Sequence, residues 1–283
     1  MKNIIVNFYK YQWTLVATLF LMVLSLIFPS LTTPLKAETM RNIAKKGTFE
    51  ICVSPRAMPL SDLIAEQQTK LPGIQIEIGK AIAKNLKVEL KINWLSYRYH
   101  AKYTKCDAFI GIGRIKGEAT NKYLKKTIPF FKVELLLATR PGLELKTIPD
   151  FKNKRVAVDN GSLAHDVLRR KSKANIFVGY STDEKRLNAL KNNKVDVALV
   201  NNIGLGWFQK NNPGFKFSTV SSKILSNTYE YDYAFGLRRS DQMTVRDFND
   251  IINEMIDDGT FQKIFNKYGV KYVVNKFEGE FIR

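Results

Sequence analysis

The chain has 283 residues, of which 45% are apolar, enough for one large domain or for two moderate halves with cores of their own. Its 45 lysines and arginines outnumber its 26 acidic residues, which gives a formal net charge of +19. Such an excess favours anionic partners. The sequence has no zinc-finger, helix-turn-helix or RNP pattern, and its lysines are scattered, so we expect a solvated basic surface and no nucleic-acid partner.

Residues 1–37 differ from the rest of the chain. Lys2 and Lys10 precede an uncharged run over residues 13–28, and a short polar stretch then leads to Ala37. This order is typical of a secretory signal peptide. The run is shorter than the roughly 20 residues that a membrane span needs, which favours a cleaved signal. It is also long for a signal peptide, so the alternative is an anchor that is retained. We expect cleavage after Ala37, and a soluble, exported chain without a further membrane span.

Strand and helix patterns alternate from residue 48 onward. Ile78, Ile82 and Leu86 recur at helical spacing within residues 72–86 and predict one buried stripe. The other expected helices are residues 163–171, residues 182–193 with a cap at Thr182 or Asp183, and residues 241–269 with a break at Gly259. The expected strands are residues 49–54, 88–95, 106–113, 154–162, 174–180, 194–202 and 229–239.

This alternation predicts an α/β fold of two lobes, each a mainly parallel sheet flanked by helices. Residues 38–133 and 234–283 are expected to form lobe 1, and residues 134–233 to form lobe 2.

Two cysteines, Cys52 and Cys106, remain after export, and an oxidising compartment would allow them to form a disulfide. If their strands are parallel with level ends, however, Cys52 lies beside Ile110. Cys106 is then about 13 Å away at about 3.3 Å per residue, too far for a bridge. The sequence leaves the disulfide open.

Ligands of open parallel sheets gather beyond the carboxyl ends of the strands. The residues expected at those ends are Ser54, Arg56, Gly113, Arg114, Asn160, Gly161, Ser162, Asn201 and Asn202. Ser162 and the amides of a helix start could hold an anion, or Ser162 could simply cap the helix. Arg114 could clamp a carboxylate or phosphate, or it could be a surface arginine.

Signals of catalysis are missing. The sequence has no G-x-S-x-G, dinucleotide or P-loop motif, and no paired carboxylates at these strand ends, since Asp107 lies at the other end of its strand. CxxC spacing and histidine clusters are also absent. We therefore expect no enzyme activity, no cofactor and no metal.

The order GTFEICVSPRAMPLS, PGIQIEIGKAIAKNL, CDAFIGIG, FKNKRVAVDNGS, ALKNNKVDVALV, YDYAFGLRRSD and DDGTFQKIFNKYGV resembles the family 3 extracellular solute-binding proteins. The resemblance implies a periplasmic receptor fold of type II, used mainly by amino-acid ABC transporters. The family's substrate-gripping arginine, however, falls on Ala119 or Thr120 here, and its ammonium-binding aspartate falls on Asn201. A zwitterion without these countercharges would lose several kcal/mol of affinity, so an ordinary amino-acid receptor is disfavoured.

Within the family, the chain resembles the quinoprotein-dehydrogenase-associated branch, the MxaJ/MoxJ type found with periplasmic methanol dehydrogenase. Cys52, Cys106 and the stretch DVALVNNIGLGW match that branch, although Asn201 replaces its tryptophan. The resemblance implies an accessory in the assembly or activation of a PQQ-dependent methanol (alcohol) dehydrogenase, which would be the partner. One alternative is the receptor of an ABC permease for an amino acid or another small solute. A second is a dehydratase-like enzyme on the same scaffold.

Overall fold

A computed structural model describes residues 40–68, 70–96, 103–115, 123–226 and 230–274. The predicted signal peptide, residues 1–37, lies outside the described residues, and so do Ala119 and Thr120. Residues 38–283 form one compact unit. No helix in the described part of the chain is long and apolar enough to cross a bilayer.

The strands are β1 (Thr48–Val53), β2 (Arg56–Ala57), β3 (Ser61–Asp62), β4 (Glu89–Trp94), β5 (Ala108–Arg114), β6 (Leu124–Thr139), β7 (Arg155–Ala157), β8 (Asn175–Phe177), β9 (Val197–Asn201), β10 (Ser218–Ser221) and β11 (Glu230–Arg238). The helices are α2 (Met40–Lys46), α3 (Leu63–Gln67), α4 (Ile74–Asn85), α5 (Leu163–Lys171), α6 (Asp183–Lys191), α7 (Asn202–Asn211), α8 (Gln242–Asp257) and α9 (Thr260–Lys267), with 3-10 turns η2 (Ile148–Phe151) and η3 (Ser222–Ile224).

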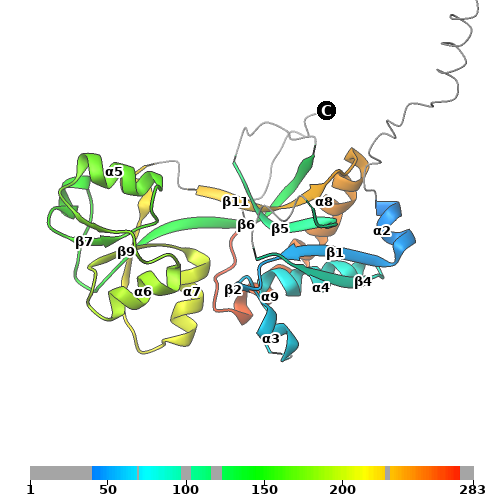
Figure 1. Cartoon of the computed structure of the whole chain (residues 1–283), viewed down its shortest axis with the longest axis horizontal. Coiled ribbons are helices and arrows are strands. Elements are labelled where there is room, and N and C mark those ends of the chain that lie inside the picture. Colours follow the sequence, from blue (N-terminus) through cyan, green and yellow to red (C-terminus); the bar gives the residue numbers. More distant parts are fainter. Residues whose placement is uncertain (1–39, 69, 97–102, 116–122, 227–229, 275–283) are drawn as a thin grey trace, which may run out of the picture. The chain divides into compact units, whose positions relative to one another are not determined.

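Two parallel groups of strands are joined by crossing strands (Figure 1). The sheet order is β4-β1-β5-β11-β6-β9-β7-β8, and β10 also pairs with β6. β1 pairs in parallel with β4 and β5, and β7 with β8 and β9. The long strand β6 and the returning strand β11 are antiparallel to their neighbours and connect the two groups. Both predicted lobe boundaries fall inside these two continuous strands, and they stay predictions.

The buried apolar side chains form separate clusters. The largest comes from β1, β5, the first half of β6, α4, α8 and α9. Two others lie between residues 137 and 225, one under α5 and one under α6 and α7. Each parallel group of strands therefore has a core of its own, as expected for two α/β halves.

Local sequence accounts for most of the helices. Ile78 and Ile82 of α4 are fully buried, which confirms the predicted stripe. Thr182 caps α6 by accepting a hydrogen bond from the Lys185 amide, and Gly259, with φ +74°, separates α8 from α9 as predicted. α7, which follows β9 directly, was not predicted from the sequence.

Cys52 and Cys106 form a disulfide, with their Cα atoms 5.7 Å apart. The expected separation of about 13 Å between the two Cα atoms was wrong. It assumed that Cys106 lies in an extended strand, whereas Cys106 precedes β5. Ile51 lies opposite Ala108, and the amide of the residue after Cys106 bonds back to β1. Both cysteines are buried, at 6% and 4% exposed, so the bridge is a structural link between β1 and the segment that leads into β5.

Candidate ligand-binding site

The turn from β7 into α5 contains three of the predicted site residues, Asn160, Gly161 and Ser162. The Ser162 hydroxyl accepts a hydrogen bond from the His165 amide at 3.1 Å and donates one to the Asp159 carbonyl at 2.8 Å. Gly161 takes φ +68°, which favours glycine. Ser162 is therefore the N-cap of α5, the simpler of its two predicted roles.

Asn201 and Asn202 lie where β9 passes into α7. The Asn201 side chain accepts from the Gly204 amide at 2.8 Å and caps α7. The Asn202 side chain donates to the Lys132 carbonyl at 3.0 Å and accepts from the Glu134 amide at 3.3 Å. Both asparagines thus form hydrogen bonds that hold the end of β9 in place. Asn201 bonds to α7, and Asn202 bonds to the crossing strand β6.

A charged group that the sequence reasoning missed connects these two strand ends. Arg186, on α6, is 5% exposed and forms ion pairs with Asp159 at 2.5 Å and with Asp183 at 2.6 Å. Asp183 also accepts from the Asn201 amide at 3.4 Å. Burial raises the pKa of the Asp183 carboxyl, although Arg186 acts in the opposite direction.

This triad places a half-exposed acid beside the predicted turn. The Asp159 side chain is 53% exposed, whereas its partner guanidinium is buried. The Nε of Arg186 is the one buried side-chain nitrogen or oxygen in the described residues that has no hydrogen-bond partner. The sequence signal was weak: an aspartate at the end of a strand, and an Asp–Arg pair three residues apart at a helix start.

The corresponding strand ends in the other half are those of β1 and β5, and β5 continues to Arg114, beyond the level at which β1 ends. Ser54 follows β1; its carbonyl accepts from the Ser61 hydroxyl at 2.7 Å, and its hydroxyl accepts weakly from the Arg56 amide at 3.4 Å. Arg56 is exposed and lies opposite Asp62 in the short β2–β3 pair. Arg56 is thus open to solvent near a strand end, where it could meet an anion.

Arg114 and Gly113 have contacts within the sheet. An Nη atom of Arg114 donates to the Thr127 carbonyl of β6, and the side chain is half-buried. The Gly113 carbonyl accepts from Lys126 Nζ at 2.5 Å. A Cβ atom at Gly113 would lie 3.3 Å from the Tyr231 ring. The glycine therefore makes room for an aromatic ring of β11.

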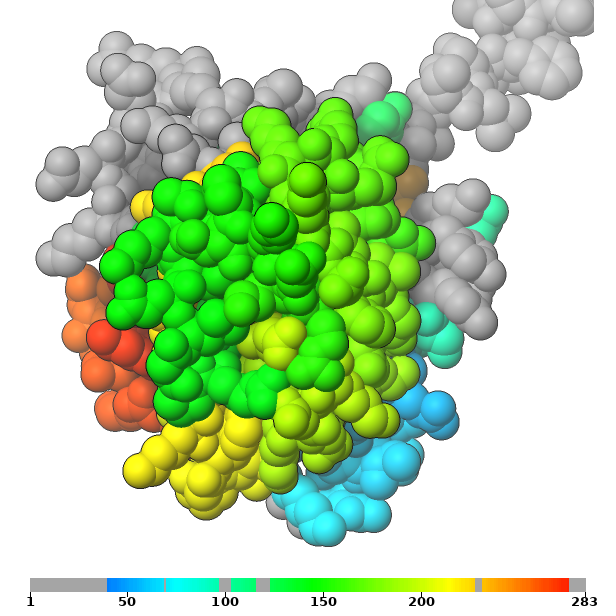
Figure 2. All heavy atoms as spheres, turned by 90° about the vertical axis from the view of Figure 1, so that its left-hand side faces the viewer, coloured from blue at the N-terminus to red at the C-terminus, as the bar shows by residue number. Residues whose placement is uncertain are grey.

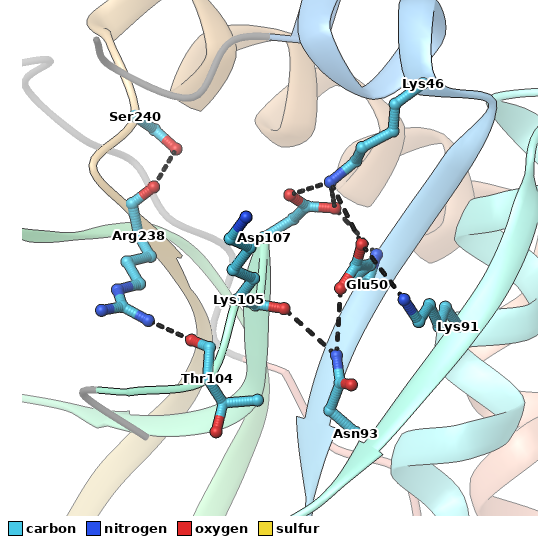
Figure 3. A network of polar contacts seen from close by, with 9 residues as sticks. All are labelled: Lys46, Glu50, Lys91, Asn93, Thr104, Lys105, Asp107, Arg238 and Ser240. Atoms are coloured by element: carbon cyan, nitrogen blue, oxygen red, sulfur yellow. Dashed lines mark hydrogen bonds and ion pairs between the residues drawn. The ribbon is translucent and has the colours of Figure 1, made fainter. Parts of the chain in front are cut away.

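A polar network lies near the amino ends of β1 and β5, away from the strand ends of the candidate site (Figure 3). The buried Asp107 carboxylate lies 2.8 Å from Lys46 Nζ and accepts from the Glu50 amide at 2.8 Å. Glu50 also lies 3.7 Å from Lys46 and 3.8 Å from Lys91 and accepts from Asn93 at 3.2 Å. Asp107 therefore anchors α2 and the start of β5, far along the strand from the candidate site.

The structure thus brings together the predicted residues at the ends of β7 and β9. The ends of β7 and β9 are joined through Arg186, and Ser54 and Gly113 follow or lie within adjacent strands. Two α/β halves connected by crossing strands define the two-lobe, type II fold of periplasmic binding proteins. The chain belongs to the bacterial extracellular solute-binding proteins, family 3, whose model matches residues 49–271.

Known relatives support the same class. The L-cystine-binding protein TcyJ of Escherichia coli (strain K12) is 24% identical over 235 residues, which cover 81% of this chain and 85% of that protein. The unliganded, open L-cystine solute receptor of Neisseria gonorrhoeae has a TM-score of 0.65 at 19% identity, covering 84% and 99% of the two chains. The periplasmic binding protein XoxJ of Methylobacterium extorquens AM1 has a TM-score of 0.59 at 20% identity, covering 80% and 100%.

Proposed function

We propose that this protein is a non-catalytic accessory of a periplasmic PQQ-dependent alcohol dehydrogenase, acting in its assembly or activation. The observation that carries the proposal is that Ser162, Asn201, Asn202 and Arg114 are already bonded within the chain. The acid beside them, Asp159, has its charge offset by a buried arginine.

A free amino acid carries two opposite charges, and a desolvated charge without a partner is costly. To bind the ammonium, Asp159 would have to share its carboxylate with Arg186. To bind the carboxylate, Arg114 would have to share its guanidinium with the Thr127 carbonyl of β6. Sharing lowers the affinity that each charge can contribute, which favours a role that does not depend on holding a zwitterion.

The cysteine pair also supports this proposal. The branch that the sequence resembles has a cysteine in the first strand and another before the third, and Cys52 and Cys106 form a disulfide at those positions. The likeness to XoxJ is a likeness of fold. The net charge of +19 would suit an acidic partner.

The second candidate is the receptor of an ABC permease for a small solute. It is favoured by the relatives, since TcyJ is an L-cystine-binding protein, and by two charged side chains open to solvent near strand ends. Arg56 is exposed on β2, and the Asp159 side chain is half-exposed at the end of β7. Such a pair offers one charge of each sign, one from each half of the molecule.

Deletion of the gene in its own bacterium tests the lead proposal. We expect dye-linked alcohol dehydrogenase activity in periplasmic extracts to fall at least tenfold and to return when the gene is restored. A strain without the gene that retains full activity contradicts the proposal.

Calorimetry on the mature protein tests the second candidate. We expect no heat of binding with L-cystine, L-arginine or other amino acids under the lead proposal. Micromolar binding that is lost in Asp159→Asn, and kept in the control Asp166→Asn, whose side chain is similarly half-exposed, would establish the receptor instead.

A further inference from the structure

Three segments of the second half meet at the amino ends of its parallel strands. The Asn153 amide donates to the Lys173 carbonyl at 2.9 Å, and the Asn175 amide donates to the Lys154 carbonyl at 2.8 Å. Arg155 donates to the Asn193 carbonyl at 2.8 Å. The loop before β7, the loop before β8 and the loop after α6 therefore form one edge, opposite the strand ends of the candidate site.

This edge collects basic side chains that are scattered in the sequence. We define the basic edge as Arg140, Lys152, Lys154, Arg155, Arg169, Arg170, Lys171, Lys173, Lys191 and Lys194. Seven of these ten residues are exposed, and the other three are half-buried. This half of the molecule faces the viewer in Figure 2, where green to yellow residues build the surface.

The acidic side chains nearby are few, and their interactions are local. Asp196 lies 2.7 Å from Arg140 and 2.8 Å from Arg155. Asp166 lies 3.8 Å from Arg169. Asp150 accepts from two backbone amides as part of a capping box, and these hydrogen bonds lower the pKa of its carboxyl. Glu144, which follows the turn after Arg140, lies 2.8 Å from Lys146, a residue outside the defined edge. Ten basic groups thus face four acidic ones, and the edge keeps a positive excess.

Helix dipoles explain only part of this arrangement. α5 and α6 both end at the edge, and a helix C-terminus favours cations because it carries about half a negative charge. That accounts for Arg169, Arg170, Lys171 and Lys191, which lie in last turns. The loop lysines, Lys152, Lys154, Lys173 and Lys194, lie outside the helices, so helix stability does not require them.

We infer that the basic edge is a docking surface for an acidic face of a partner protein. Concentrated charge of one sign steers a partner of the opposite sign and orients it. Binding to a membrane surface usually adds apolar side chains that enter the lipid. The large exposed apolar residues of this half, Leu163, Phe177 and Val178, lie at the other ends of α5 and β8. A partner at the edge would leave the candidate ligand site open. The inference holds for either proposed function.

The test compares two variants of equal net charge. The edge variant combines Lys152→Gln, Arg170→Gln, Lys171→Gln and Lys173→Gln. The control variant replaces four exposed lysines dispersed over the other half, Lys45→Gln, Lys84→Gln, Lys263→Gln and Lys271→Gln. Unfolding in urea checks that both variants are folded.

The probes are poly-L-glutamate and vesicles of phosphatidylglycerol with phosphatidylcholine, at low and physiological salt. Because an exposed ion pair contributes a factor of about 1.4 to 5, we expect the edge variant to bind poly-L-glutamate about tenfold more weakly. The control should lose less than threefold. Equal losses in the two variants would show a general charge effect and overturn the inference. Vesicle binding that is lost in the edge variant, while poly-L-glutamate binding is kept, would assign the edge to lipid and overturn the choice of a protein partner.

Discussion

The buried carboxylate of Asp107 offers a direct test of what holds β1, β5 and α2 together. Its side chain is 5% exposed and accepts hydrogen bonds from Lys46 Nζ, at 2.8 and 3.0 Å, and from the Glu50 amide, at 2.8 Å. Asp107→Ala removes both acceptor oxygens without disturbing the neighbouring disulfide. Asp107→Asn keeps one acceptor oxygen and removes the charge.

The size of the effect is worked from the Glu50 amide and Lys46 as donors. The Glu50 amide would lose a partly buried acceptor, which costs about 1–3 kcal/mol. The Lys46 side chain is 33% exposed and can turn toward water and Glu50, so its lost ion pair adds only about 1 kcal/mol. We expect Asp107→Ala to lower the free energy of unfolding by about 3 kcal/mol, and Asp107→Asn by about half as much.

Equilibrium unfolding in urea, followed by circular dichroism with the disulfide intact, measures these differences. Asp166→Ala is the control, because Asp166 is an acid whose side chain is 46% exposed and lies 3.8 Å from Arg169. It should change stability by less than about 0.5 kcal/mol. A loss below about 1 kcal/mol for Asp107→Ala would refute the idea that this carboxylate anchors the segment.

Three other perturbations probe the fold. Replacing Cys52 and Cys106 together by serine should cost about 4 kcal/mol in the loop-entropy model, since the bridge joins residues 54 positions apart; a loss under 1 kcal/mol in urea unfolding would contradict this. The guanidinium groups beside Asp196 lower the pKa of its carboxyl from 3.8 to about 2. Its stabilising contribution should therefore be complete above pH 4 and lost as the pH falls toward 2, and Asp196→Asn should flatten that part of the stability–pH curve. Gly206→Ala would place a Cβ atom 2.6 Å from a carbonyl oxygen of the segment after α9, and should destabilise by about 1–3 kcal/mol in thermal melts, whereas Gly214→Ala, with open space around it, should not.

The missed helix α7 shows where local patterns fail. Its sequence contains Gly204 and Gly206, which lower helix propensity, so the strand pattern before it dominated the prediction. In the folded chain both glycines are needed for close packing. A Cβ atom at Gly204 would collide with the Asp183 side chain, and one at Gly206 would collide with the segment after α9. Tertiary contacts outweigh propensity here.

The candidate site was predicted only in part, because local features are visible in the sequence and long-range contacts are not. Turn residues at the ends of strands, such as Gly161 and Ser162, are visible in the sequence because their chemistry is local. The ion pair of Arg186 with Asp159 is not, because Asp159 is 27 residues away from the arginine and approaches it only when β7 and α6 pack together. The sequence therefore missed that the end of β7 carries an acid paired with a buried arginine, whereas the predicted absence of the family's countercharges stays a prediction.

The sequence by itself determined the α/β class, the strands of the two parallel groups together with β11, and the ends of the helices that it predicted, but not the long crossing strand β6. These features depend on apolar periodicity and capping residues within about ten positions of one another. Only the tertiary structure decided the disulfide, the Asp107 network, the Arg186 triad and the basic edge. Each of them joins residues from separate loops and strands, and which of these meet depends on strand register and on the packing of helices against the sheet.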